Sequence, residues 1–332
     1  MLAKIQSFLF FILLIPNLYS ESFSIMNLNA QNLFDTLDDV DKDDKAFLPI
    51  ENKESFDHIN ACHNINVKAW RMECLYLDWN EDTKNAKLAN LVKTIISYDN
   101  TGADIIALQE VENNNILEQL YILLKPYGYI DYVLVEGTDK RGIDNAFISK
   151  FKMSDPKLHY VKFSPQFEKK DTRPILEASI FFNNKKIRIY NVHFPSNFND
   201  LQMRIESFNL LKELHLFHSD ASIALGDFNL NSKDDLKEGI YKNQEDQWYV
   251  AHREGCLSCK GSYYYSYGKS WDFLDTIFVS RDRGIYFDKD TINVLKTDFN
   301  TYKDSGKPHR FDPKTKKGVS DHFPMVSRIN LN

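Results

Sequence analysis

Two polar residues follow a short apolar run near the middle of the chain. Residues 221–225 (ASIAL) predict a buried strand, and Gly226 ends it where a backbone without Cβ turns sharply or admits a ligand. Asp227 and Asn229 come directly afterwards. Ligands of α/β sheets bind beyond the carboxyl ends of strands, so this acid and amide suit an active site. An Asx-type turn is the alternative interpretation.

Other polar residues stand at the edges of predicted strands in the same way. Each directly precedes or follows a short apolar run: Asn29, Glu110, His193, Asp275, Asp321 and His322. We expect these side chains to converge at one end of a sheet. Each alone also has a structural explanation, such as a helix cap for Glu110 or a turn for His322.

Carboxylate, amide and imidazole groups in one place suit the hydrolysis of a phosphoester. The reaction needs neutralised phosphoryl charge, an oriented water and help for the leaving oxygen. Mg²⁺ prefers oxygen ligands, which predicts Glu110 as the main ligand, Asn29 as a neutral donor, and Asp321 as a direct or water-mediated one. Mn²⁺ or Ca²⁺ are alternatives. Imidazole titrates near neutral pH, so His322 suits acid–base chemistry or oxyanion stabilisation.

Strands and helices alternate along the chain. Apolar residues at helical spacing predict three amphipathic helices, at 84–97, 115–124 and 201–217. Shorter apolar runs predict strands at 23–29, 104–108, 129–135, 145–148, 177–182, 186–192, 271–279 and 323–329. The pattern favours two packed sheets covered by helices.

An acidic segment follows the first predicted strand. Asp39, Asp41 and Asp43 have the spacing of a calcium-binding loop, but Asp44 stands where such a loop requires Gly and Ile50 where it requires Glu. We therefore predict a solvated acidic loop.

The N-terminus has the pattern of a secretory signal. Lys4 precedes the apolar residues 8–15, which are too few to span a bilayer that needs ~20. We predict a signal peptide at residues 1–20, a single domain at 21–332, and a secreted or periplasmic protein. An apolar first strand or an uncleaved anchor is the alternative.

Four cysteines agree with an oxidising compartment. We predict the local pairs Cys62–Cys74 and Cys256–Cys259, with a four-cysteine zinc site as the alternative.

Composition limits the class of protein. The chain has 332 residues, 43% of them hydrophobic, and a net charge of −6, which argues against binding polyanions through overall charge. Residues 296–317 are locally basic and end next to Asp321, so they suit either a substrate-binding loop or a solvated loop.

Six short motifs resemble, in order, those of the endonuclease/exonuclease/phosphatase superfamily, which has the fold of deoxyribonuclease I. The resemblance covers about 24–329 and rests on residues 29–35 (NAQNLFD), 108–111 (LQEV), 191–193 (NVH), 226–229 (GDFN), 274–275 (LD) and 320–322 (SDH). It implies an α/β (α+β) fold, a four-layer α/β/β/α sandwich, with one metal-dependent site at the edge of two central sheets.

The resemblance also implies roles for individual residues. Asp227 would orient or deprotonate the attacking water, and Asn229 would bind the phosphate or the nucleophile. Asp275 would be the carboxylate that fixes the tautomer of His322.

The remaining expectations concern the second histidine and the phosphate. His193 would be the second histidine, with Asp144 orienting it, and Asn191 would contact the substrate. Arg173 resembles a phosphate-contacting arginine, which bidentate donors suit, and a surface ion pair is its alternative explanation.

Together these observations favour an exported, magnesium-dependent phosphodiesterase, a nuclease acting on DNA, with no stable protein partner. A phospholipid or inositol phosphate hydrolase is the alternative, for which residues 263–265 and Tyr267 are candidate exposed aromatics. A non-catalytic binding protein on the same fold is a third hypothesis, against which every expected catalytic position carries a competent residue.

Overall fold

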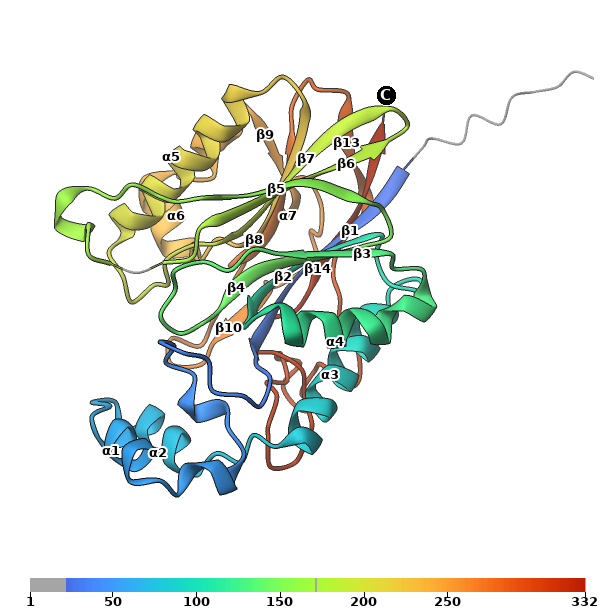
Figure 1. Cartoon of the computed structure of the whole chain (residues 1–332). Coiled ribbons are helices and arrows are strands. Elements are labelled where there is room, and N and C mark those ends of the chain that lie inside the picture. The colour runs from blue at the N-terminus through green and yellow to red at the C-terminus, as the bar shows by residue number, and fades with distance from the viewer. Residues whose placement is uncertain (1–21, 171, 332) are drawn as a thin grey trace, which may run out of the picture.

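Two six-stranded sheets form the centre of the protein (Figure 1). The computed structural model describes residues 22–170 and 172–331, so the predicted signal peptide at 1–20 lies outside the described residues. The first sheet has the order β13-β14-β1-β2-β4-β3. Its strands are β1 (Ser22–Leu33), β2 (Ile105–Val111), β3 (Asp131–Leu134), β4 (Asp144–Ser149), β13 (Ile285–Val294) and β14 (Met325–Leu331).

The second sheet has the order β5-β6-β7-β8-β12-β9. Its strands are β5 (Met153–His159), β6 (Ile175–Phe182), β7 (Lys185–His193), β8 (Ala221–Asp227), β9 (Trp248–Val250) and β12 (Asp275–Ser280). A separate hairpin pairs β10 (Tyr263–Tyr265) with β11 (Ser270–Asp272).

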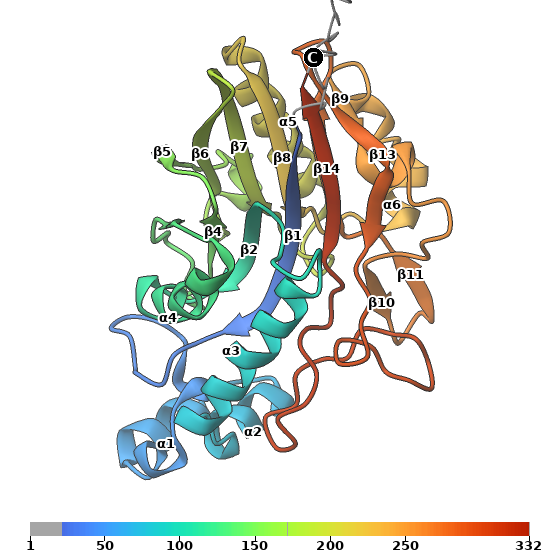
Figure 2. The ribbon, with the colours of Figure 1, turned by 90° about the vertical axis from the view of Figure 1, so that its right-hand side faces the viewer.

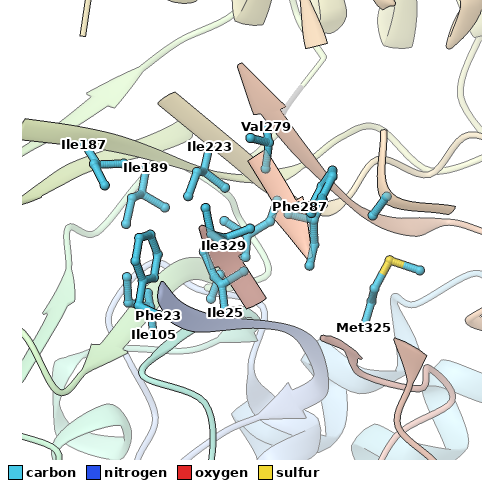
Figure 3. Close-up of a cluster of buried hydrophobic side chains, with 14 of the residues drawn as sticks. Phe23, Ile25, Ile105, Ile187, Ile189, Ile223, Val279, Phe287, Met325 and Ile329 are labelled. Atoms are coloured by element: carbon cyan, nitrogen blue, oxygen red, sulfur yellow. The ribbon is translucent and has the colours of Figure 1, made fainter. Parts of the chain in front are cut away.

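The two sheets bury a shared apolar core between them (Figure 3). Successive side chains of a strand point to opposite faces. In β1, Phe23 and Ile25 therefore face the second sheet, whereas Met26 and Leu28 face the helices on the outside. From the second sheet, Ile189 is one of the residues that meet Phe23 and Ile25 in this core.

Helices cover the outer face of each sheet, which confirms the predicted four layers. On the first sheet lie α3 (Glu81–Ile96) and α4 (Asn114–Leu124). The side chains of the N-cap residues Asn80 and Asn113 accept backbone hydrogen bonds at the start of each helix. On the second sheet lies α5 (Leu201–Phe217), with α6 (Ser232–Glu238) and α7 (Ala251–Glu254) nearby (Figure 1). In residues 22–170 and 172–331, no helix has both the length and the apolar character to cross a membrane.

Two further helices, α1 (Phe56–His63) and α2 (Lys68–Tyr76), lie away from the sheets (Figure 2). The disulfide Cys62–Cys74 joins them, and Cys256–Cys259 is the second disulfide. Both predicted pairs are confirmed, and they leave no thiolate for the alternative zinc site. The short 3-10 helices are η1 (Lys45–Phe47), η2 (Ile50–Lys53), η3 (Lys125–Tyr127), η4 (Pro165–Phe167) and η5 (Lys242–Gln244).

Several elements differ from the sequence-based expectations. The strand predicted at 271–279 is split, because β11 joins the separate hairpin and only β12 enters the second sheet. The strands β5 and β13 were not expected, since half or more of their residues are exposed or only half-buried at the sheet edges and give no continuous apolar run.

The acidic segment after β1 is solvated only in part. Asp41 and Asp43 are exposed as predicted, but Asp39 is half-buried and Asp44 is 1% exposed. The backbone N–H of Asp35 ties the loop to the end of β2. Burial of a carboxylate depends on tertiary contacts that its spacing along the chain does not reveal.

Gly226 occupies a position that requires glycine. Its φ is +148°, and a Cβ there would lie 1.9 Å from the carbonyl oxygen of Val192 on the neighbouring parallel strand. The close approach aligns the ends of β7 and β8, and therefore His193 and Asp227, which are opposite each other in the register.

Gly226→Ala should lower the free energy of unfolding by more than about 3 kcal/mol, because the new Cβ forces β7 and β8 apart. Urea unfolding followed by circular dichroism measures this. Gly239→Ala is the matched control: its φ is +62° but nothing lies within 4 Å of the added Cβ, so it should cost only about 1–2 kcal/mol. Equal losses in the two variants would contradict the steric explanation.

Candidate active site

The candidate site lies where four strands of the two sheets end together. β1 runs parallel to β2 in the first sheet, and β7 runs parallel to β8 in the second. Near the carboxyl ends of these strands stand Asn29, Glu110, His193 and Asp227. The predicted convergence of polar residues at one edge is therefore present.

Asn29 lies at the centre of this group. Its Nδ2 donates to Asp227 Oδ2 at 3.2 Å and to Glu110 Oε1 at 3.4 Å. Its Oδ1 accepts a hydrogen bond from the backbone N–H of Gln31 at 2.9 Å. The predicted metal ligation through the Asn29 oxygen would require the side-chain amide to turn over, so that its oxygen faces the carboxylates.

Each carboxylate oxygen of Glu110 accepts a hydrogen bond, Oε1 from Asn29 as above. Its Oε2 accepts from the backbone N–H of Asn32 at 2.9 Å, and its backbone has a φ of +60°. Burial alone would raise the pKa of Glu110, but the charges of Arg141, His322 and Arg173 outweigh it and lower the pKa. Glu110 is therefore ionised at neutral pH.

His193 contacts both carboxylates as a neutral imidazole. Its Nε2 lies 3.6 Å from Asp227 Oδ2 and 3.9 Å from Glu110 Oε1. Burial, followed by the positive charges of Arg173 and Arg141, holds the pKa of His193 well below its ordinary value. A neutral ring at this position can donate one hydrogen bond without adding charge.

His322 and Asp275 form a buried pair. His322 Nδ1 lies 2.6 Å from Asp275 Oδ2, and this carboxylate oxygen also accepts from Ser262 Oγ at 2.7 Å. Asp275 Oδ1 accepts from Asn27 Nδ2 at 3.0 Å. Burial works against protonation of His322, but Asp275 raises its pKa well above the ordinary value, so His322 is positively charged at neutral pH.

Asp227 lies between the two histidines. His322 Nε2 is 4.0 Å from Asp227 Oδ2, and Asp227 Oδ1 accepts from the backbone N–H of Asn229 at 2.9 Å. The pKa of Asp227 is raised to about 7, because burial and the nearby charge of Asp275 outweigh the opposing charge of His322. A carboxylate with this pKa is a competent proton acceptor near neutral pH.

Two of the predicted site residues, Asn229 and Arg173, lie beside this group and share a hydrogen-bond partner. Asn229 Nδ2 donates to the carbonyl oxygen of Phe194 at 3.0 Å, which fixes the loop after β8. Arg173 donates to the same carbonyl oxygen at 3.2 Å and lies 3.7 Å from Asp139. Its charge acts on both Glu110 and Asp227, so it is close enough to serve an anionic substrate there.

Asp144 does not orient His193. Its Oδ1 accepts from the backbone N–H of Gly137 at 3.0 Å, and within the described residues His193 Nδ1 has no hydrogen-bond partner. The expectation failed because Asp144 begins β4 and pairs with Val111, which directs it to the neighbouring loop.

Asn191 is a structural residue and not a substrate contact. It is fully buried, and its Nδ2 donates to the carbonyl oxygens of Leu108 at 2.9 Å and Ala146 at 2.8 Å, while its Oδ1 accepts from Gln109 Nε2 at 2.7 Å. All three partners belong to the opposite sheet. The motif identified Asn191 correctly as part of this region, but the expected substrate contact is wrong because the side chain points into the opposite sheet.

Some residues of the site were not identified from the sequence. Asn27 and Ser262 hold Asp275, Arg141 donates to Asn32 at 2.8 Å, and the ring of Tyr263 lies 4.9 Å from that of His322. Two of them carried a sequence signal: Asn27 shares a strand face with Asn29, and Tyr263 belongs to the aromatic run 263–265. Ser262 and Arg141 lie outside the motifs.

The donor set fits a divalent cation. Glu110 and Asp227 place carboxylate oxygens on either side of Asn29, and Asp321 is half-buried, with its charge acting on His322. Hard cations prefer such oxygen donors, and they also balance closely spaced carboxylates. Such an ion would be held by Glu110 with oxygens of Asn29, Asp227 or Asp321.

Two packed sheets with a carboxylate–histidine site at their shared edge are the architecture of the deoxyribonuclease I-like class. Residues 24–331 match the sequence model of the Endonuclease/Exonuclease/phosphatase family, and the chain belongs to this family. A search of curated proteins found no match.

Solved structures agree on the fold. An endonuclease/exonuclease/phosphatase family protein from Bacteroides thetaiotaomicron matches 94% of this chain and 98% of its own, with 15% identity and a TM-score of 0.57. TDP2 from D. rerio, solved with a single-strand DNA product, matches 93% and 99% with 14% identity and a TM-score of 0.56. A mannosyl-6-phosphatase from B. thetaiotaomicron matches 93% and 99% with 15% identity and a TM-score of 0.55.

The His322–Asp275 pair should behave as one unit in turnover. We expect His322→Ala to lower the single-turnover rate by ~10²–10⁴-fold, as for the loss of a positioned acid or base. Asp275→Asn should also lower the single-turnover rate, because an amide does not stabilise a charged imidazole. The double variant should be little slower than His322→Ala. Losses that multiply would show that the two residues act separately.

Asp227 should make stability depend on pH in the protein without metal. Its carboxyl ionises near pH 3.8 when unfolded and at about 7 when folded, so stability falls as pH rises through this range. Asp227→Asn removes this effect. Relative to the variant, wild type should lose on the order of 4 kcal/mol in free energy of unfolding between pH 4 and pH 8. Parallel stability curves from urea unfolding would refute the raised pKa.

Proposed function

We propose that the protein is an exported, Mg²⁺-dependent phosphodiesterase whose substrate is DNA. The observation that carries the proposal is the convergence of Glu110, Asp227, His193 and the His322–Asp275 pair around Asn29. This group combines an ionised metal ligand, a proton acceptor and a charged proton donor within one buried site. Membership in a family of phosphoester hydrolases supports the same chemistry.

The residues divide the reaction between them. Asp227 orients a water and accepts its proton, because its pKa of about 7 leaves much of it ionised near neutral pH. His322 is charged, and its Nε2 faces the space beside Asp227, where it stabilises phosphoryl charge or donates a proton to the leaving oxygen. Asp275 holds His322 in the required tautomer. A bound Mg²⁺ would neutralise phosphoryl charge.

Cationic groups around the site suit a polyanionic substrate. Arg141 and Arg173 both act electrostatically on Glu110 from one side. On the other side, Lys307 from the basic segment lies 3.8 Å from the centroid of Tyr264, and Tyr263 packs against His322. Aromatic rings beside cations bind single-stranded nucleic acid by stacking and charge attraction. The D. rerio TDP2 structure contains a single-strand DNA product.

A phospholipid or inositol phosphate hydrolase is the second candidate. The hairpin next to His322 carries the 45% exposed Tyr265, and the 91% exposed Tyr267 follows it. Exposed aromatics near an active site also suit the interface of a lipid surface. The same site chemistry would serve either substrate, so only the leaving group differs.

Export is supported by chemistry at two places. Lys4 followed by the apolar residues 8–15 has the pattern of a cleavable secretory signal. The disulfides Cys62–Cys74 and Cys256–Cys259 use all four cysteines, as expected for an oxidising compartment. Fractionation of cells that produce the full chain would test this part of the proposal.

A substrate panel tests the activity. Purified protein is incubated with plasmid, single-stranded and double-stranded oligonucleotides, sphingomyelin and phosphatidylinositol phosphates, in Mg²⁺ or EDTA. We expect DNA cleavage in Mg²⁺ that EDTA abolishes. Glu110→Gln should lower the rate by at least ~10²-fold, because it removes the charged ligand. Glu118→Gln, the same change at an exposed position on α4, is the control and should leave the rate unchanged.

The panel also separates the alternatives. Release of lipid head groups with plasmid left intact would replace the nuclease proposal by the lipid hydrolase. Absence of hydrolysis on every substrate would favour the non-catalytic hypothesis.

A further inference from the structure

A second acidic cluster lies apart from the residues assigned to catalysis. It consists of Asp35, Asp39 and Asp44 on the loop after β1, and Glu112 just after β2. Asp44 and Glu112 are 1% and 3% exposed, and Asp39 is half-buried. Carboxylates at this depth need hydrogen bonds and opposite charge.

Asp35 has its hydrogen bonds satisfied and serves as the scaffold of the cluster. Its Oδ1 accepts from the backbone N–H of Leu37 at 2.7 Å. Its Oδ2 accepts from Asn113 Nδ2 at 3.2 Å and from Asn115 Nδ2 at 2.6 Å. The start of α4 is thereby tied to the acidic loop.

For each of the other three carboxylates, the described residues provide a hydrogen bond to one oxygen. Asp44 Oδ2 accepts from the backbone N–H of Asp39, and Glu112 Oε2 from that of Asp35, both at 2.7 Å. Asp39 Oδ2 accepts from Asn113 Nδ2 at 3.1 Å. Asp44 Oδ1 is buried and, within the described residues, has no partner at all. The side chain also makes no cap for η1, which begins at the next residue.

The three carboxyl groups lie close to one another. One oxygen from each of Asp39, Asp44 and Glu112 lies within 4.8 Å of the other two. Oxygen ligands that surround one Ca²⁺ at about 2.3–2.6 Å are separated by no more than about 5 Å. The three carboxylates therefore have the spacing of ligands that share an ion.

No side chain in the described part of the chain supplies the opposite charge. Among the described residues, no Lys or Arg forms an ion pair with Asp39, Asp44 or Glu112. The two nearest lysines along the loop are engaged elsewhere: Lys45 with Asp38 at 3.0 Å, and Lys42 with the carbonyl oxygen of Asp139 at 3.0 Å. Three carboxyl groups are thus gathered without a cationic side chain, and ionising all three together is unfavourable in the apo protein.

We propose that Asp39, Asp44 and Glu112 bind a structural divalent cation with the coordination chemistry of Ca²⁺. Ca²⁺ accepts six to eight oxygen ligands in flexible geometry and tolerates an irregular loop, whereas Mg²⁺ requires near-ideal octahedral geometry and keeps several waters. The buried, unpartnered Asp44 Oδ1 favours the ion that dehydrates more easily. The site is not an EF-hand, because its third carboxylate comes from a different part of the chain.

The bound ion would fix the edge of the catalytic site. It would join the loop after β1 to Glu112, which directly follows β2 and lies two residues beyond Glu110. The same loop contacts the segment that carries Arg141, through the backbone N–H of Asp43 and the carbonyl oxygen of Lys140 at 2.7 Å. The proposal concerns stability and does not depend on the proposed substrate.

Thermal unfolding of the full chain in a Glu110→Gln background tests the proposal, because this background removes the main ligand of the candidate catalytic ion. The Glu110→Gln protein is the parent, and two double variants are compared with it. One also carries Asp44→Asn, and the other carries Asp43→Asn, the same change at the neighbouring exposed residue. At a Ca²⁺ concentration of about 100 times Kd, the melting temperature of the parent and of Asp43→Asn should rise by about 5 °C relative to EGTA. Asp44→Asn should shift by less than about 1 °C.

Without calcium, in EGTA, the melting temperature of Asp44→Asn should not be below that of the parent. Asp44→Asn removes a buried charge but keeps an oxygen acceptor for the N–H of Asp39, so without calcium it should melt at the same or a higher temperature than the parent. Glu112→Gln, a second variant, should show the same pattern. No calcium-dependent shift in the parent, an equal shift in Asp44→Asn, or a lower melting temperature of Asp44→Asn in EGTA would each overturn the proposal.

Discussion

The strict alternation of side chains along a β-strand determines where the site lies. Strand faces that point between the sheets are apolar through most of their length and become polar at one end. Ile223 and Leu225 precede Asp227 on the same face of β8, and Phe23 and Ile25 precede Asn27 on β1. The site is thus the polar continuation of the inter-sheet core, and its residues cannot shift without moving that core.

Buried amides then fix one sheet against the other. Asn191 from β7 bonds to backbone carbonyls of β2 and β4, and Gln109 from β2 bonds back to Asn191. Apolar contacts alone tolerate sliding, but these amides are satisfied in only one arrangement of the sheets. Asn27 adds a similar bond to Asp275. Several residues of the recognisable motifs therefore serve to align the two halves of the site.

This explains what the sequence predicted and what it did not. Strand ends with polar residues located Glu110, Asp227, Asp275 and His322, because each residue follows or precedes an apolar run, and the family resemblance indicated that the last two form a pair. The direction of a side chain at such an end depends on the partner strand, so the expectations for Asp144 and Asn191 were wrong. The half-exposed edge strands β5 and β13 lacked the apolar pattern on which strand prediction depends.

Charge balance distinguishes the two acidic clusters near the end of β2. The cluster at the candidate active site contains His322, whose charge offsets part of that on Asp227 and Asp275, and Arg173 lies close by. Asp227 can also hold a proton near neutral pH, which lets it take part in proton transfer. Within residues 22–170 and 172–331, the cluster of Asp39, Asp44 and Glu112 has no histidine or arginine among its hydrogen-bond or ion-pair partners. Its carboxylates can be neutralised only by protons or by a metal ion, and Ca²⁺ would keep them ionised without making them reactive.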